Sequence, residues 1–409
     1  MQKWYKVLGP GILYAGAAIG VSHLVQSTRA GADFGYGLVW AILLANILKY
    51  PFFEYGPRYA ASTGKSLLHG YKALSKWALI LFTLLTVLSM FIIQSAVTVV
   101  TAGLASEITG WIIEPWLMSA VLLVICSSIL LIGKYKVLDK TMKIIIVILS
   151  LSTVVALVAA FTGHHEKYEE YMTQFAFSDK THILFLIALM GWMPAPFDIS
   201  VWHSLWSVEK AKEEPNRDLK TALLDFKIGY WGTLILALCF VSLGAFTIYG
   251  SGIQLENSGG KFAKQLIGIY TENIGSWSYV VIALAAFTTM LSTTLTCLDA
   301  SPRVLEESSN MLIGEKQWKV SYYWIWIIAL VIGTVVILAF FMTNMKELVD
   351  FATIVAFVTS PIIAILNFLA VTGKTMPQEN KPGLGLKILS WLGIVYFLGF
   401  SLYFLYFTL

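Results

Sequence analysis

The stretch GAAIGVSHLVQ, from Gly16 to Gln26, lies inside the first long apolar run of the chain. Glycine weakens a helix, and a hydroxyl and an imidazole are unusual inside lipid. Backbone leaves helical geometry within a membrane only where the freed N–H and C=O groups line a cavity or bind something. We therefore predict that the first helix breaks around Gly20, Ser22 and His23 to form part of a binding site.

A second stretch, GWMPAPFDIS from Gly191 to Ser200, interrupts the sixth apolar run. Pro194 and Pro196 remove two backbone donors, and each disfavours helix at the residue before it. The first and sixth runs are corresponding positions of a five-plus-five inverted repeat, in which broken helices meet at the bilayer midplane and bind substrate. We predict one transmembrane transporter domain over residues 1–409, with repeats over about 9–161 and 182–371 and an extra helix over about 388–407.

The composition places the whole chain in a membrane. Hydrophobic residues make up 57% of it and charged residues 13%, with a mean hydropathy of +0.74, which is too apolar for a soluble protein of this length. An all-α membrane protein of about eleven spans follows from runs of spanning length, at residues 9–28, 36–54, 77–104, 115–132, 143–161, 182–206, 228–249, 278–298, 322–341, 348–371 and 388–407.

Most of the 28 lysines and arginines fall in loops on the side of the N-terminus. This bias predicts a cytoplasmic N-terminus in a multi-pass inner (plasma) membrane protein. The net charge of +4 is therefore explained by topology, and we expect no nucleic-acid partner.

Motifs of soluble enzymes are absent from the sequence. It has no dinucleotide glycine motif and no His-Glu-x-x-His, and STGKSLLHG lacks the upstream glycine of a phosphate loop. We expect neither an enzyme nor a bound cofactor. The cysteines Cys126, Cys239 and Cys297 show no pairing or metal-ligand spacing, which indicates a packing role.

Ionisable residues inside spans are costly and usually functional. His23 lies at the first break, and Asp198 and His203 lie at the second. Lys49 and Glu54, near the end of the second span, are interpreted as structural residues that extend toward the membrane surface. The same structural interpretation applies to the residues near other span ends, which are Lys227, Asp299 and Asp350.

At these residues the chain resembles the Nramp family of divalent-metal transporters, which have a LeuT-type fold. Similarity runs through most of the chain, in GPGILYAGAAIG, AGADFGYGLVWAILLANIL, RYAASTGKSL, LDKTMKIIIVILSLSTVVALV and the pair Met193-Pro194. The family's Asp-Pro-Gly-Asn signature aligns with residues 20–23, so Gly20 replaces its metal-binding Asp and His23 its Asn. Ala195 replaces the histidine of the family's Met-Pro-His motif. The resemblance thus implies a member whose ion site has been rebuilt.

The resemblance implies that Met193 and the carbonyl groups near Gly20 and Met190 survive as ligands. Our first hypothesis is a transition-metal site built from His23, Met193 and Asp198, with Gly20, Ser22 and Met190 completing the substrate site. Imidazole and thioether suit Mn²⁺ or Fe²⁺ better than Mg²⁺. Because imidazole titrates near neutral pH, His23 or His203 would carry a proton in symport with the ion, and Asp198 is a third candidate for proton coupling.

A second hypothesis abandons the transition metal. Without the first-helix Asp, the N–H groups around Gly20 and Ser22 would hold the anionic group of a small organic solute, or the site would carry another cation such as Mg²⁺. The aromatic wall for a solute would come from Trp192, Phe197 and Trp202. A sensor without transport is a third interpretation, and the sequence leaves the oligomeric state open.

Overall fold

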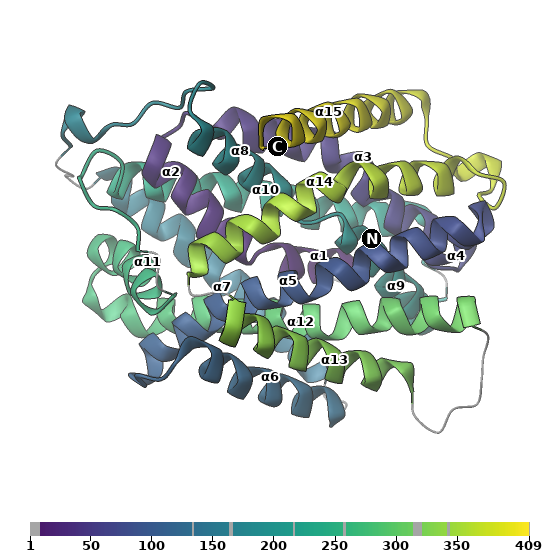
Figure 1. Cartoon of the computed structure of the whole chain (residues 1–409), viewed down its shortest axis with the longest axis horizontal. Helices are drawn as coiled ribbons and strands as arrows, with labels where there is room; N and C mark the ends of the chain where they lie inside the picture. Colours follow the sequence, from purple (N-terminus) through teal and green to yellow (C-terminus); the bar gives the residue numbers. More distant parts are fainter. Residues whose placement is uncertain are drawn as a thin grey trace, which may run out of the picture.

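The computed structural model of the chain describes residues 9–132, 135–162, 167–215, 217–256, 259–313, 321–341 and 344–408. These residues form an all-helical fold whose long helices run roughly along the longest axis of the molecule (Figure 1). The helices are α1 (Pro10–Ala18), α2 (Thr28–Phe34), α3 (Val39–Thr63), α4 (Leu67–Leu74), α5 (Lys76–Thr109), α6 (Pro115–Leu131), α7 (Tyr135–Thr162), α8 (Lys180–Trp192), α9 (Asp198–Glu213), α10 (Leu219–Thr247), α11 (Gly259–Ile274), α12 (Tyr279–Ile313), α13 (Tyr322–Val336), α14 (Met345–Thr372) and α15 (Leu384–Thr408).

Local sequence explains where several helices begin and end. Ser75 and Asp218 cap α5 and α10, because their side chains accept hydrogen bonds from the backbone N–H groups of Ala78 and Thr221. α3 and α5 end at Gly64 and Gly110, whose φ angles of 68° and 69° lie in the left-handed region that favours glycine. Such signals place helix ends but leave open how the helices pack.

Both predicted breaks are confirmed. The first run forms α1, then a π-helical segment over Ser22–Ser27 that continues into α2. The sixth run forms α8 and α9, with no helix between Met193 and Phe197. Discontinuous helices at these two positions characterise the predicted LeuT-type fold.

The exposed surface of the outer helices is apolar, as expected of a membrane protein. Val124 of α6, Ile328 of α13 and Val395 of α15 are 60%, 57% and 66% exposed. By length and composition, six helical segments of the described residues are long and apolar enough to cross a membrane: 76–109, 219–247, 276–313, 322–341, 345–372 and 384–406. The other predicted runs coincide with α3, α6, α7 and the two broken helices.

Glycines let the broken first helix lie directly on α10. A Cβ at Gly11 would lie 2.1 Å from the carbonyl oxygen of Asp225, and one at Gly31 would lie 1.9 Å from that of Val241. Any larger residue would push the helices apart, since such separations are far below van der Waals contact. α10 therefore positions both halves of the first helix.

Candidate substrate site at the two helix breaks

At the first break, α12 approaches the backbone of residues 19–21. A Cβ at Gly20 would lie 3.0 Å from the side chain of Thr293. The hydroxyl of Thr293 lies 3.4 Å from the carbonyl oxygen of Gly16 and 3.5 Å from that of Ile19. This hydroxyl partly satisfies carbonyl groups that the break leaves without helical partners. Sequence reasoning did not single out Thr293, although the run STTLTC on α12 was a signal.

At the second break, α8 lies against α14. A Cβ at Gly191 would lie 1.9 Å from the carbonyl oxygen of Thr353, so only glycine permits this approach. The chain then leaves α8 at Met193, and the Met193–Pro194 peptide bond is cis. The two prolines thus end α8 next to α14. The carbonyl groups in the last turn of α8 therefore have no hydrogen-bond partners within the helix.

The two breaks meet through Ser22. Its hydroxyl oxygen lies 3.3 Å from the carbonyl oxygen of Pro194, 2.8 Å from that of Ala18 and 2.7 Å from Nδ1 of His23. Sequence reasoning placed the two breaks together, and this contact joins them directly.

His23 points toward α10. Its Nε2 lies 3.0 Å from the carbonyl oxygen of Thr233, and its Nδ1 faces the Ser22 hydroxyl. In the neutral imidazole Nε2 therefore carries the proton, and Nδ1 accepts from Ser22. Both ring nitrogens are engaged in this arrangement, and the single proton of the Ser22 hydroxyl is shared among Nδ1 and the carbonyl oxygens of Ala18 and Pro194.

Lys49 of α3 was interpreted as a residue that extends toward the membrane surface, and this interpretation was wrong. Its side chain is fully buried. The amine donates to the carbonyl oxygen of Gly191 at 2.7 Å and to that of Ala195 at 3.2 Å. A basic group from α3 therefore lies at the second break.

Asp198 and His203 lie further along α9. Asp198 is buried in the first turn of α9. The His203 ring lies 5.7 Å from the ring centroids of Tyr14 and Phe226. Neither of its ring nitrogens has a hydrogen-bond partner among the described residues.

The predicted metal ligands share the buried middle of the molecule without forming one cluster. Met190 and Met193 are fully buried, and the Met190 sulfur accepts a hydrogen bond from the Tyr396 hydroxyl at 3.2 Å. In the described part of the chain, no hydrogen bond joins His23 to Asp198, and no group of three or more His, Cys, Asp or Glu side chains is placed to hold a metal ion.

A cavity of about 840 Å³ lies at the α11 end of the molecule, which carries α2, α11 and residues 167–179. Arg29 and Asp350 lie in its lining, and the Arg29 guanidinium pairs with both carboxylate oxygens of Asp350 at 2.6 and 3.0 Å. Gln26 bonds to both partners at 2.9 Å. This ion pair joins α2 to α14 between the cavity and the first break.

We expect Asp350→Asn to open this end, because it leaves the nearly buried Arg29 guanidinium without its counter-charge. A cysteine in place of Thr353, one turn along α14 and fully buried, should react with a membrane-impermeant maleimide faster when Asp350→Asn is also present. Glu347→Gln is the control, since Glu347 is an exposed residue of the same cavity. Equal labelling rates in the two backgrounds would show that the ion pair does not close the path.

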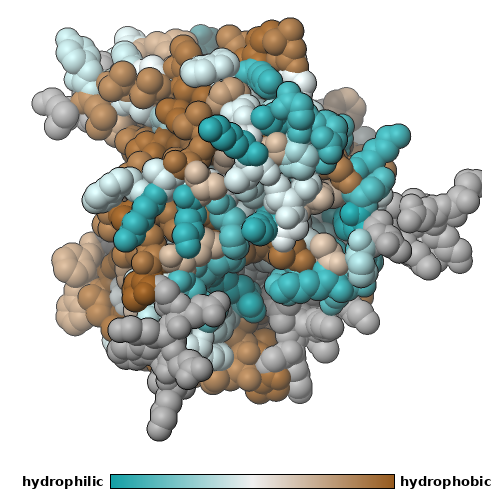
Figure 2. Space-filling model, turned by 90° about the vertical axis from the view of Figure 1, so that its right-hand side faces the viewer, coloured by the Kyte–Doolittle hydropathy of each residue, from teal (hydrophilic) through white to brown (hydrophobic). Residues whose placement is uncertain are grey.

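A second cavity, of about 1020 Å³, lies at the opposite α4 end, among α1, α4, α9 and α12. Its lining includes Leu13, Trp206, Lys210, Asp299 and Arg303. Figure 2 shows this end, where hydrophilic residues gather across the middle of the face and hydrophobic residues lie mainly toward its rim. The chain thus has a cavity with charged residues in its lining at each end.

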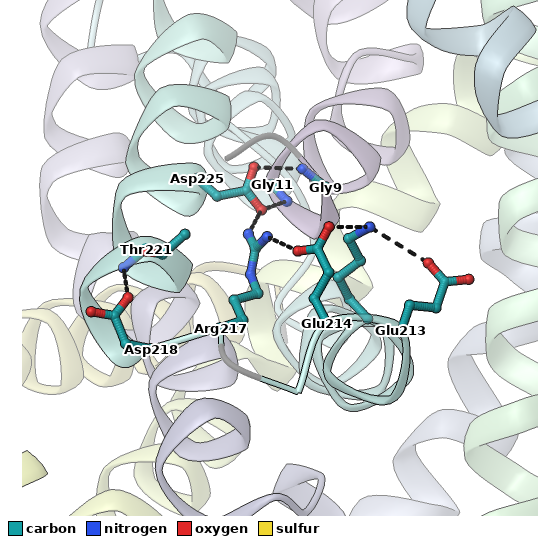
Figure 3. Close-up of polar contacts among 9 residues, drawn as sticks. Gly9, Gly11, Glu213, Glu214, Arg217, Asp218, Thr221 and Asp225 are labelled. Atoms are coloured by element: carbon teal, nitrogen blue, oxygen red, sulfur yellow. Dashed lines mark hydrogen bonds and ion pairs between the residues drawn. The ribbon is translucent and has the colours of Figure 1, made fainter. Parts of the chain in front are cut away.

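At the α4 end, α1 is tied to α10 by a buried carboxylate (Figure 3). Asp225 accepts from the N–H groups of Gly9 and Gly11 at 3.0 and 2.8 Å, and pairs with Arg217 at 2.7 Å. Arg217 also pairs with Glu214. We name Asp225, Arg217 and the two N–H groups the Asp225 cap. A carboxylate at a helix N-terminus is favourable for the helix dipole as well.

The predicted site residues lie between the two cavities. All of them are buried, and neither cavity is lined by any of them: Gly20, Ser22, His23, Met190, Met193 and Asp198. The site residues are therefore closed off from both cavities, with the Arg29–Asp350 pair at the α11 end and the Asp225 cap at the α4 end.

Comparison with known proteins identifies relatives of the whole chain. The model of the natural resistance-associated macrophage protein-like (Nramp) family matches residues 11–407. An uncharacterised protein of Pasteurella multocida is 35% identical over 98% of this chain and 92% of its own length. The divalent metal cation transporter MntH of Staphylococcus saprophyticus is 22% identical over 96% of this chain and 90% of its own.

Among solved structures, a mutant of the Eremococcus coleocola manganese transporter superposes with a TM-score of 0.74 at 12% identity, over 98% of this chain and 87% of that one. At this identity the match establishes a common fold. It agrees with the broken helices described above.

Proposed function

Because the chain belongs to the Nramp family, we propose that it is a secondary transporter that carries a divalent transition-metal ion, Mn²⁺ or Fe²⁺, by alternating access. The Eremococcus coleocola neighbour is described as a manganese transporter, and the Staphylococcus saprophyticus relative as a divalent metal cation transporter. The observation that carries the proposal is the contact of Ser22 with Pro194, which joins two helix breaks in an occluded space between two cavities.

The groups at the breaks suit a cation of intermediate softness. Carbonyl oxygens of Gly191 and Ala195 already accept from a basic group, Met193 adds a thioether, and Asp198 is a buried carboxylate near the second break. Thioether sulfur selects transition metals over Mg²⁺ and Ca²⁺, which prefer oxygen alone. His23 holds Ser22 and the first break in position.

The charge bias of the loops supports an inner (plasma) membrane protein whose α4 end faces the cytoplasm. A proton would move with the ion on Asp198, His203 or His23. Of these, His203 is the one whose buried ring nitrogens have no hydrogen-bond partner among the described residues.

The test is Mn²⁺ influx into proteoliposomes, read by quenching of a trapped metal-sensitive dye. We expect uptake by the wild type and a loss of about tenfold or more in Asp198→Asn and Met193→Ala, because ligands and their supporting groups are typically worth this much in metal affinity. His23→Ala should also lower uptake. The control is Met118→Ala, a methionine buried in α6. Influx that matches empty liposomes for Mn²⁺ and Fe²⁺ would contradict the proposal.

A second candidate is transport of a small anionic solute, favoured by one observation. The first break has Gly20 where the family has a carboxylate, and the second break holds the amine of Lys49. A site with this charge pattern would bind a carboxylate. Failure of metal uptake together with counterflow of a labelled carboxylate would favour it. Uptake of Mg²⁺ that Met193→Ala leaves unchanged would instead identify an oxygen-only cation site.

A further inference from the structure

The Lys49 amine is held differently from other buried basic groups of the molecule. Arg29 and Arg217 pair with the carboxylates of Asp350 and Asp225. The Lys49 amine instead donates to two backbone carbonyl oxygens, and it forms no ion pair with a carboxylate of the described residues. A basic group within a membrane is costly unless carbonyl groups or charges solvate it. The two carbonyl oxygens provide that solvation for the Lys49 amine.

Two aromatic rings complete that environment. The Lys49 nitrogen lies 5.2 Å from the ring centroid of Phe197 and 5.9 Å from that of Phe397. Both distances are within the range of cation–π attraction. Carbonyl oxygens and aromatic faces together form a set that binds a positive charge.

The carbonyl groups concerned belong to the second break itself. Gly191 lies in the last turn of α8 and Ala195 lies in the interruption before α9. The C-terminal end of a helix carries partial negative charge, and in broken-helix transporters such ends and unwound carbonyl groups coordinate the cation. Lys49 therefore occupies the place where a transported cation would be bound.

We propose that the Lys49 side chain is a tethered cation that occupies the cation subsite of the second break in the substrate-free protein, and that the transported cation takes its place. The inference rests on the proposed function as far as the cation is a metal ion. Two positive charges exclude each other from one subsite, so the ion binds only as the amine withdraws. The return of the amine then expels the ion and fills the subsite while the empty carrier reorients.

The first test compares Lys49→Met with the wild type in Mn²⁺ binding and transport. Removing the competitor should lower the apparent dissociation constant for Mn²⁺ by about tenfold or more, which corresponds to roughly 1.4 kcal/mol. Net uptake should fall, because the ion leaves more slowly, while exchange of internal for external Mn²⁺ persists. Lys227→Met, at an exposed position of α10, is the matched control and should change neither. Unchanged affinity and net uptake in Lys49→Met would overturn the inference and leave the proposed function intact.

The second test needs no metal. Lys49→Ala leaves a space whose missing atoms match n-propylammonium, so n-propylammonium chloride should raise the melting temperature of this variant more than sodium chloride or n-propanol does. It should not stabilise the wild type or Lys49→Met, in which a side chain fills the space. If n-propylammonium stabilises Lys49→Ala but the wild type does not transport Mn²⁺, the proposed metal substrate is wrong and the role of Lys49 as a tethered cation is supported. Equal effects of the ammonium salt, sodium chloride and propanol would refute the tethered cation.

Discussion

Asp225→Asn is expected to open the α4 end of the protein. The substitution removes the buried one of the two carboxylate charges with which Arg217 pairs, and it leaves one acceptor atom for the N–H groups of Gly9 and Gly11. Asp225 and Arg217 are 1% and 6% exposed at their side chains. Removing one partner of a buried pair costs about 3–5 kcal/mol, so the closed form should lose roughly a hundredfold or more in population relative to a form with α1 released.

Labelling of a cysteine at Leu13 measures this opening. Leu13 lies in α1 and lines the cavity at the α4 end, so it should react faster with a maleimide when α1 is released. The native cysteines are buried. Asp218→Asn is the control, because Asp218 is an exposed cap of α10 next to the Asp225 cap (Figure 3). If Leu13→Cys reacts at the same rate with and without Asp225→Asn, the cap does not hold α1.

Gly191→Ala is expected to distort the second break more than any other glycine-to-alanine substitution at the site. The new Cβ would lie 1.9 Å from the carbonyl oxygen of Thr353, which is backbone and cannot rotate away. α8 and α14 must separate, and the Gly191 carbonyl then loses its position near Lys49. Overpacking of this kind costs about 1–3 kcal/mol and occasionally more, and the rigid partner places this case at the upper end.

The measurement for Gly191→Ala is the midpoint of thermal unfolding in detergent, together with Mn²⁺ uptake. We expect a lower midpoint and uptake reduced to the level of empty liposomes. Gly232→Ala is the matched control: Gly232 lies in the middle of α10, and nothing lies within 4 Å of a Cβ built there. A Gly191→Ala protein with the midpoint and uptake of the wild type would mean that α8 and α14 move apart freely.

The breaks were predictable because their causes are local. Pro194 and Pro196 cannot continue a helix, and Gly20 with Ser22 weakens one, so the residues themselves carry the signal. The meeting of the breaks followed from the pairing of the first and sixth helices in an inverted repeat. The contact of Ser22 with Pro194 confirms that the two segments adjoin.

The role of Lys49 was not predictable by the same reasoning. The sequence places it two residues before Pro51 near a span end, where a lysine usually extends to the surface. Whether it points outward or to Gly191 depends on how α3 is rotated against α8, and a single sequence contains no measure of that rotation. Asp225 was missed for a similar reason, since its partners Gly9 and Gly11 are more than two hundred residues away.

The ligand set of His23, Met193 and Asp198 remains a prediction. For these three side chains to bind one ion, some contacts in the structure must be exchanged. His23 would have to exchange its contacts with Ser22 and Thr233 for the ion, whereas Met193 is buried at the second break without such a competing bond among those described. Removing the Ser22 hydroxyl by Ser22→Ala should therefore weaken the link between the breaks while leaving Met193 in place.

The position of the transported ion can be measured directly in an anomalous difference map at the manganese edge from crystals soaked in Mn²⁺. We expect a peak between the two breaks, near Met193 and the carbonyl oxygens of Gly191 and Ala195, with the Lys49 amine displaced from them. A peak confined to the cavities at the two ends, with Lys49 still bonded to both carbonyl groups at Mn²⁺ concentrations that saturate uptake, would contradict this expectation.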